Sequence, residues 1–369
     1  YLNIRGAFTL SEVEGQWFDS FHSLTISPER SRKTMGRRQT TIAVLGDGGW
    51  GTTLAIHLHR LGHRILWWGA FPDYLRVLDR RRENVKFLPD IRIPRTLRIT
   101  PDLSSAIEPA RVIVLAIPSQ YLRTIARRLK LYSLSSKVVV SVVKGLETHT
   151  LKRMSEVIQE ELNDVPVAVL SGPNIASEVA RGQPASSVVA SERGGVAAEI
   201  QQAFMSERFR IYTSSDVIGV ELGGALKNPI AIAAGIGDGL GFGANAKAAL
   251  ITRGVVEMTR LGVAMGAREE TFWGLSGLGD LITTCLGGRN RWLGEQIGKG
   301  KRLTTILAGV SGIIEGVTTT KAAVALGRRY RVELPIIEQV HAILFRRKNP
   351  RTALRDLMLR ARKAESLAT

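Results

Sequence analysis

The chain contains one cysteine, Cys285, among 369 residues, so no intrachain disulfide can form. A lone thiol is typical of a reducing compartment, and we therefore expect a cytoplasmic protein. The six histidines fall at no metal-binding spacing, and we expect no metal site. No run of 18 apolar residues occurs, which argues against a membrane span.

Acidic residues are few beside basic ones: 33 Asp and Glu stand against 51 Lys and Arg, a formal net charge of +18. Such an excess also occurs in nucleic-acid-binding proteins. Here the basic residues are dispersed, and no nucleic-acid motif or aromatic-interleaved patch accompanies them. A basic surface that attracts anionic small molecules explains the charge as well. We therefore favour a small phosphate substrate over a specific nucleic-acid partner.

A glycine-rich turn is the most informative segment. An apolar run, 41–45, leads into Gly46, Gly48 and Gly51 at G-x-G-x-x-G spacing, and a helical pattern follows over 52–62. In a dinucleotide-binding turn the first glycine permits the tight turn and the second lets the backbone approach a pyrophosphate. The third lets the helix pack on the strand, and the helix start offers N–H groups to the phosphates. The sequence therefore predicts a bound NAD or NADP.

The hydrophobic pattern divides the chain into two parts. Strands are expected at 41–45, 64–68, 110–117, 136–143, 165–170, 185–190 and 209–213, and long helical stretches at 217–236, 246–265 and 318–326. Apolar strands that alternate with helices predict a parallel sheet covered on both faces. The expected fold class is an α/β N-terminal Rossmann-type dinucleotide-binding domain followed by an all-α C-terminal substrate domain.

The domain boundaries follow from this division. We expect Met35 to be the natural start, and we expect 1–39 to be a non-native or disordered N-terminal extension. The dinucleotide-binding domain is expected at 40–214, the helical substrate domain at 215–347, and a polar C-terminal helix or tail at 348–369.

Three polar segments directly follow predicted strands, where ligands of open α/β sheets bind. Pro118 follows the strand at 110–117, and Lys144 follows the strand at 136–143. Gly172 and Asn174 come after the strand at 165–170. Because Lys144 directly follows a long apolar strand, we expect it to act in the site rather than in a solvated loop.

Two segments of the helical part carry the chemistry. Lys227 lies in an otherwise apolar stretch, where burial is costly without a partner and lowers a lysine pKa toward neutrality. Such a lysine suits proton transfer, and the alternative is that it extends to the surface. Asp280 lies among glycines and is expected to orient a neighbour. Arg289 follows a Gly-Gly pair and predicts a phosphate clamp, with a solvated charge as the alternative. Cys285 is expected to be a small buried side chain rather than a nucleophile.

Six ordered segments resemble those of NAD(P)-dependent sn-glycerol-3-phosphate dehydrogenases. They are GDGGWG at 46–51, IPS at 117–119, KGLE at 144–147, SGPNIASEV at 171–179, ELGGALKN at 221–228 and GDLITTCLGGRNR at 279–291. The resemblance implies reversible NAD(P)H-dependent reduction of dihydroxyacetone phosphate to sn-glycerol 3-phosphate, which supplies glycerophospholipid synthesis. It also implies a homodimer.

The resemblance also implies roles for individual residues. Lys227 matches the catalytic acid/base, with Lys144 and Asp280 beside it. The implied substrate-binding residues are Lys144, Gly172, Asn174, Lys227, Asn228, Asp280, Thr284, Arg289 and Asn290. The implied cofactor-binding residues are Gly46, Gly48, Gly49, Trp50, Gly51, Pro118, Lys144, Ala176, Arg289 and Glu315.

Several alternatives stay open. No Asp or Glu ends the second predicted strand, where an acidic residue usually marks NAD, and Ala70 stands there instead of a basic residue. NAD and NADP are therefore not distinguished, and Arg76 is the candidate partner of a 2′-phosphate. A related dehydrogenase acting on another small carbonyl substrate, or a non-catalytic dinucleotide-binding protein, would share the same turn.

Overall fold

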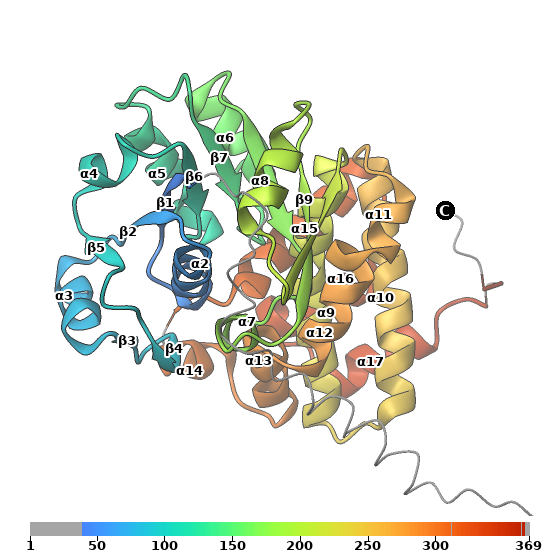
Figure 1. The fold of residues 1–369 in the computed structure, drawn as a ribbon. Helices are drawn as coiled ribbons and strands as arrows, with labels where there is room; N and C mark the ends of the chain where they lie inside the picture. The colour runs from blue at the N-terminus through green and yellow to red at the C-terminus, as the bar shows by residue number, and fades with distance from the viewer. Residues whose placement is uncertain (1–38, 311, 363, 366–369) are drawn as a thin grey trace, which may run out of the picture. The chain divides into compact units, whose positions relative to one another are not determined.

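The computed structural model describes residues 39–310, 312–362 and 364–365 (Figure 1). Every described helix and strand belongs to one compact unit, Gln39–Thr369. The expected extension, apart from residue 39, and the expected start at Met35 lie outside the described residues.

The centre of this unit is an eight-stranded sheet in the order β10-β9-β8-β7-β6-β1-β2-β5. Its strands are β1 (Thr41–Leu45), β2 (Arg64–Trp68), β5 (Arg98–Thr100), β6 (Val112–Leu115), β7 (Val138–Ser141), β8 (Val167–Ser171), β9 (Ala185–Ala190) and β10 (Phe209–Ser214). All seven strands expected from the sequence are present. The short β5 and a hairpin of β3 (Glu83–Asn84) and β4 (Leu88–Arg92) were not expected, because they carry no apolar run.

The predicted parallel sheet is present, but one pair of its strands is antiparallel. Neighbouring strands run parallel except β8 and β9, which pair antiparallel with Val169 opposite Ala190. The connection between them holds only the short helix α7 (Ala176–Ala180), which packs on α2 (Gly49–Arg60). A parallel return needs a longer crossover, usually across a face of the sheet.

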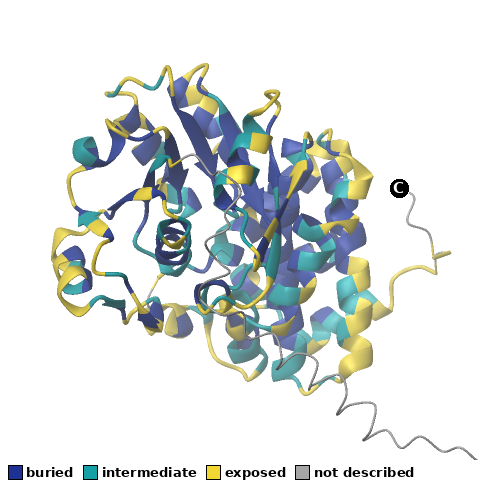
Figure 2. Cartoon of the chain, in the orientation of Figure 1, coloured by how far each residue is buried: buried dark blue, intermediate teal, exposed yellow. Residues whose placement is uncertain are grey.

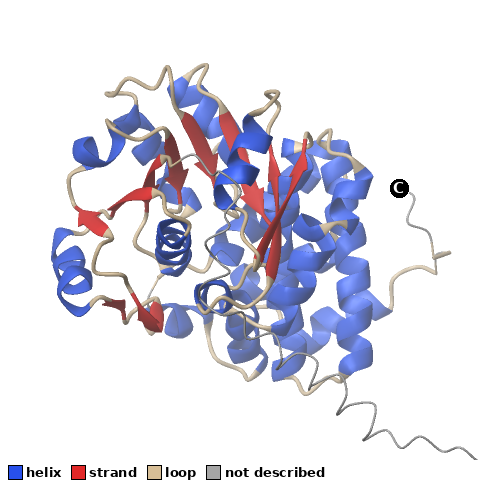
Figure 3. Cartoon of the chain, viewed as in Figure 1, coloured by secondary structure: helices blue, strands red, loops and turns tan. Residues whose placement is uncertain are grey.

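Helices cover both faces of the sheet, as predicted (Figure 3). The central strands β1, β2, β6, β7 and β8 are almost wholly buried (Figure 2), and along β1 Ile42 and Val44 enter one core while Ala43 and Leu45 enter the other. The first core includes residues of α2 and α8 (Val196–Phe204), and the second includes residues of α4 (Leu103–Ile107), α5 (Leu122–Leu129) and α6 (Met154–Leu162). This two-sided burial explains the near-continuous apolar strand sequences.

The region after β10 is helical, as expected. The elements are α9 (Val217–Gly239), α10 (Ala244–Ala264), α11 (Glu269–Trp273), a π-helical turn η3 (Leu275–Gly279), α12 (Asp280–Leu286), α13 (Arg289–Gly298), α14 (Leu303–Ala308), α15 (Glu315–Tyr330), α16 (Pro335–Arg346) and α17 (Pro350–Met358). The three expected helical stretches correspond to α9, α10 and α15.

Helix α9 is the core of this region, and α10, α12, α13 and α15 pack on it. Helix α13 approaches it with backbones nearly touching: a Cβ on Gly235 would stand 1.9 Å from the carbonyl oxygen of Arg291, and one on Gly294 2.0 Å from that of Ile232. Only glycine permits this approach, which brings the start of α13 beside the middle of α9.

Helix α9 is also the one described helix long and apolar enough to cross a membrane. Its most apolar window is 89% buried inside the protein. Its composition is therefore accounted for by its place in the core.

Candidate active site

The glycine turn has the geometry that its spacing predicts. Gly46 has a φ of +129°, and a Cβ there would stand 2.2 Å from the carbonyl oxygen of Ala116. A Cβ on Gly51 would stand 2.2 Å from the carbonyl oxygen of Gly46, so α2 packs directly on the turn. Nothing lies within 4 Å of a Cβ on Gly48, which leaves that backbone open to a ligand. Helix α2 begins at Gly49, three residues before the expected start, and its N-terminus faces this open side.

Three other implied cofactor residues, Trp50, Ala176 and Pro118, lie around this turn or at the end of β6. Trp50, in the first turn of α2, packs edge-to-face against Phe209 with ring centroids 6.4 Å apart. The carbonyl oxygen of Ala176 accepts a hydrogen bond of 2.9 Å from Thr53 Oγ1. Pro118 directly precedes the short 3-10 helix η2 (Ser119–Tyr121).

Glu315 meets the end of β6 through Ser119. Its Oε1 accepts a 2.8 Å hydrogen bond from the Ser119 N–H, and its Oε2 accepts a 2.5 Å bond from Ser119 Oγ. Burial raises the pKa of this carboxyl above its usual value. A Cβ on Gly145 would stand 2.6 Å from Ser119 Oγ, so the segment after β7 lies against the same pair. Sequence reasoning missed Ser119, although it directly follows the predicted Pro118.

Lys144 and Lys227 share one buried carboxylate. Lys144 Nζ donates to Asp280 Oδ2 at 2.8 Å, and Lys227 Nζ donates to Asp280 Oδ1 at 2.7 Å. Lys227 also donates to Thr284 Oγ1 at 2.6 Å. Lys227 is 6% exposed and Asp280 2%. The alternative in which Lys227 extends to the surface is therefore wrong.

Two ammonium groups beside one carboxylate leave this cluster with an excess positive charge. Burial lowers the pKa of Lys144 to about 8; Asp280 opposes the shift, and the charge of Lys227 adds to it. Lys144 can therefore gain or lose a proton near neutral pH, which is the range that proton transfer requires.

Lys144 is fixed by two further acceptors from the segment after β8. It donates to the carbonyl oxygen of Gly172 at 2.9 Å and to Asn174 Oδ1 at 2.8 Å. Asn174 Nδ2 in turn donates to Ser187 Oγ at 3.0 Å. Two of the three segments predicted to follow strands thus meet at this ammonium group.

The amide side chains of Asn228 and Asn290 link the lysine cluster to α13. Asn228 Nδ2 donates to the carbonyl oxygen of Lys144 at 3.0 Å, and its Oδ1 accepts from Asn290 Nδ2 at 2.9 Å. Asn290 Oδ1 accepts from the Gly316 N–H at 3.0 Å. These bonds join the end of β7 to α9, α13 and α15.

Arg289 begins α13 directly after Gly288, whose φ is +95°. Its side chain is exposed, and its Nη1 would stand 3.1 Å from a Cβ on Gly312. Arg76, the candidate 2′-phosphate partner, is exposed on α3 (Pro72–Arg81) and forms an ion pair with Asp73.

Two further buried residues have structural roles. Glu221 is buried and accepts from Arg153 Nη1 at 2.7 Å and from the N–H of Ser155 at 2.7 Å, so it is the charge partner of Arg153. Cys285 is fully buried, and burial raises the pKa of its thiol to about 12. A thiol with that pKa does not form the thiolate that nucleophilic catalysis needs.

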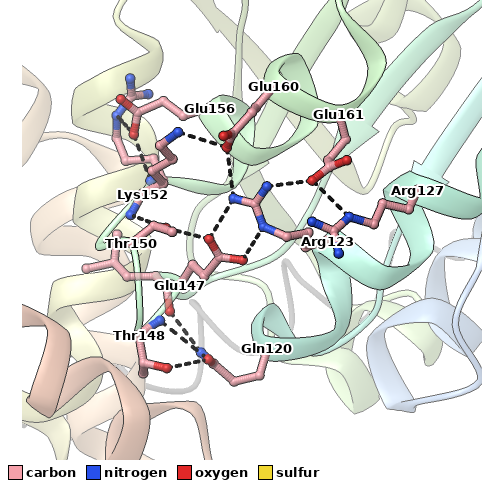
Figure 4. Close-up of polar contacts among 12 residues, drawn as sticks. Gln120, Arg123, Arg127, Glu147, Thr148, Thr150, Lys152, Glu156, Glu160 and Glu161 are labelled. Carbon is pink, nitrogen blue, oxygen red and sulfur yellow. Dashed lines mark hydrogen bonds and ion pairs between the residues drawn. The ribbon is translucent and has the colours of Figure 1, made fainter. Parts of the chain in front are cut away.

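An ion-pair network holds the loop that carries Lys144 (Figure 4). Arg123 on α5 donates to both carboxylate oxygens of Glu147 at 2.8 Å and to Glu161 on α6 at 2.6 Å. Gln120 donates to the carbonyl oxygen of Leu146 at 2.9 Å. Glu147 therefore anchors the loop to the helices and does not face the lysine pair.

The class of protein follows from these observations. A Rossmann-type sheet with an open glycine turn, and two lysines on one buried carboxylate beside the carboxyl ends of β7 and β8, define a nicotinamide-dependent dehydrogenase.

Comparison with known proteins identifies the family. Residues 41–197 match the N-terminal part of the NAD-dependent glycerol-3-phosphate dehydrogenases, and residues 216–355 match the C-terminal part. The chain belongs to this family, whose reaction is the reversible reduction of dihydroxyacetone phosphate with NAD(P)H.

The matches to individual relatives extend over nearly the full length of those relatives. A glycerol-3-phosphate dehydrogenase [NAD(P)+] of Thermoanaerobacter sp. is 49% identical over 88% of this chain and 98% of its own, and one of Fusobacterium nucleatum is 46% identical over the same shares. The crystal structure of glycerol-3-phosphate dehydrogenase from Coxiella burnetii superposes with a TM-score of 0.84 at 37% identity, over 87% of this chain and 99% of that one.

Proposed function

We propose that this chain reduces dihydroxyacetone phosphate to sn-glycerol 3-phosphate, reversibly, with Lys227 as the acid/base. The observation that carries the proposal is the pair of ammonium groups, Lys144 and Lys227, held on opposite oxygens of the buried Asp280 carboxylate. When bound, the nicotinamide supplies or accepts the hydride.

Lys227 is the proton donor in this scheme. Negative charge develops on the carbonyl oxygen as a ketone is reduced, and an ammonium group that meets this oxygen stabilises the charge and delivers a proton. Asp280 orients Lys227 and keeps its charge compensated while the site is empty. In the reverse direction Lys227, once neutral, accepts the hydroxyl proton.

Lys144 and the amide chain orient the substrate. The second positive charge of Lys144 adds to the field at the carbonyl oxygen, and Asn228 offers an amide beside it. Gly172, Asn174 and Thr284 hold the two lysines in place. Arg289 and Asn290, at the start of α13, are the proposed phosphate contacts. A fixed phosphate places the reacting carbon for an effectively unimolecular step.

The proposed cofactor contacts surround the glycine turn and the ends of β6 and β7. They are Gly46, Gly48, Gly49, Trp50, Gly51, Pro118, Lys144, Ala176, Arg289 and Glu315. The open backbone at Gly48 and the adjacent start of α2 support this assignment, because they leave N–H groups free for a pyrophosphate.

An assay of the purified chain tests the reaction. Nicotinamide absorbance is followed with dihydroxyacetone phosphate and either NADH or NADPH, and substrate-dependent oxidation is expected. Oxidation with a different small carbonyl substrate but not with this one would indicate the related-dehydrogenase alternative. Cofactor binding with no turnover of any such substrate would indicate the non-catalytic alternative.

Replacing Arg289 tests the phosphate clamp. A charge-assisted hydrogen bond contributes about 1.5–3 kcal/mol, so Arg289→Ala should raise the KM for dihydroxyacetone phosphate roughly ten- to a hundredfold. The effect on kcat should be smaller. Steady-state kinetics measure both, with Arg329→Ala, an exposed arginine of α15, as the control. An unchanged KM in Arg289→Ala would exclude the clamp.

We also propose the finer properties that the family resemblance implies: a cytoplasmic homodimer that supplies glycerol 3-phosphate for glycerophospholipid synthesis. Light scattering should give twice the 40.3 kDa mass of one chain. The proposed domain boundaries stay at 40–214, 215–347 and 348–369. The end of β10 at Ser214 and the start of α9 at Val217 support the central one.

A further inference from the structure

The end of β2 lacks the acidic side chain with which NAD-binding sheets commonly bond the adenosine ribose. Trp68 is followed by Gly69 and Ala70, neither of which has a polar side chain. A direct hydrogen bond from this strand to a ribose hydroxyl is therefore absent, and any acidic group at this position must come from another segment.

Asp47, in the glycine turn after β1, places a carboxylate at this position. A Cβ on Gly69 would stand 2.6 Å from Leu75 Cδ2, 2.8 Å from Asp47 Oδ2 and 3.1 Å from Asp47 Cβ. The side chains of Asp47 and Leu75 therefore share the space that a side chain at position 69 would take. The two strand ends are also joined directly, because the Gly46 N–H donates to the carbonyl oxygen of Trp68 at 2.9 Å.

The turn that carries Asp47 is fixed, but one oxygen of its carboxylate has no hydrogen-bond partner among the described residues. Its backbone carbonyl accepts a 2.8 Å hydrogen bond from Asn84 Nδ2, which fixes the turn. Among the described residues, Oδ2 is buried and accepts no hydrogen bond, while the residue as a whole is partly exposed. A buried polar atom without a partner is costly, and a ligand hydroxyl at this place would supply the missing donor.

Positive charge near Asp47 comes from the turn between β3 and β4. Lys86 acts on the carboxylate at longer range, but it is exposed, and its Nζ lies 5.1 Å from the centre of the Phe87 ring. An exposed ammonium is strongly screened by water, so the nearer carboxylate dominates the field at the end of β2.

We propose that Asp47 accepts a hydrogen bond from the 2′-hydroxyl of the adenosine ribose, and that its negative charge disfavours a 2′-phosphate. The chain thereby selects NAD over NADP with an acid from the first turn rather than from the second strand. The inference rests on the proposed function only in requiring a nicotinamide dinucleotide as the ligand.

Dissociation constants for NADH and NADPH test the inference without any turnover. They are measured by nicotinamide fluorescence for the wild-type chain and for Asp47→Asn, which keeps the shape and removes the charge. The wild type should bind NADH at least about tenfold more tightly than NADPH, and Asp47→Asn should reduce that ratio about tenfold through tighter NADPH binding. Equal or tighter NADPH binding in the wild type, or an unchanged ratio in the variant, would overturn the proposal.

Asp73→Asn is the matched control, because Asp73 is an exposed acid on α3 that pairs with Arg76. It should leave the ratio unchanged. A shift as large as that of Asp47→Asn would assign the discrimination to Arg76 and refute the role of Asp47. If Asp47→Asn does not fold, Asp47→Ser is measured in its place against the same expectations.

Failure of the Asp47 proposal and failure of the proposed reaction can be told apart. NADH binding without reduction of dihydroxyacetone phosphate would contradict the proposed function and leave the Asp47 comparison intact. Turnover of dihydroxyacetone phosphate, together with an unaltered ratio of the NADH and NADPH dissociation constants in Asp47→Asn, would support the proposed function and contradict the role of Asp47.

Discussion

Lys227→Met is expected to lower kcat by about 10²–10⁴-fold, the usual contribution of a positioned general acid, and to leave the dissociation constant for NADH nearly unchanged. Methionine keeps the length of the side chain in a pocket where Lys227 is 6% exposed, but it has no proton to give. Because the change also removes one of two ammonium groups beside Asp280, it relieves charge crowding and should not unfold the protein. Steady-state kinetics and NADH fluorescence measure the two quantities.

The control for this prediction is Lys301→Met, which changes an exposed lysine. It should retain full kcat. Residual activity of Lys227→Met within about tenfold of the wild type would show that another group supplies the proton, and Lys144 would then be the candidate.

Asp280→Asn is expected to be damaging in both activity and stability. It leaves the buried Lys227 and the partly buried Lys144 without their shared carboxylate, and removing one partner of a buried pair costs about 3–5 kcal/mol. The pKa of Lys144, already lowered to about 8, should fall further once the attraction of Asp280 is lost. Less Lys144 is then charged at neutral pH, so kcat should fall as well.

The loss of stability should depend on pH in a defined direction. A lysine whose pKa is lowered by folding binds fewer protons in the folded chain than in the unfolded one, so stability rises with pH between the folded value and 10.5. The destabilisation by Asp280→Asn should therefore be larger at pH ~7 than at pH ~9.5. Thermal unfolding at the two pH values measures it.

Asp164→Asn, at an exposed acid paired with Arg193, is the control and should unfold at the wild-type temperature. An Asp280→Asn protein of wild-type stability at both pH values would mean that the lysines do not depend on this carboxylate for their charge.

Much of the fold could be predicted because the apolar residues of the local sequence are the residues that the fold buries. The strand at 64–68 begins with Arg64 and continues through four buried residues, and β2 has these bounds. By contrast, β5 is an edge strand of three residues, Arg98–Thr100, and pairs only with β2. A strand so short and so little covered has no apolar run by which it could be predicted. The antiparallel step at β9 escaped prediction because strand direction depends on how the connecting segment packs.

The sequence predicted the separate residues of the site but not how they meet. The position of Lys144 after a buried strand, and that of Lys227 in an apolar helix, identified both as candidates without a structure. Asp47 was missed, because it stands between two glycines of a recognised turn and its importance depends on Gly69 in another strand.

The sequence by itself determined the glycine turn, the strands and the candidate lysines, because each depends on residues close together in the chain. Only the tertiary structure decided that Asp280 joins Lys144, 136 residues before it, to Lys227, 53 residues before it. That meeting depends on how α9 and α12 pack against the carboxyl ends of β7 and β8. Such packing arises from burial and close backbone approach across the whole fold, and no local pattern of residues records it.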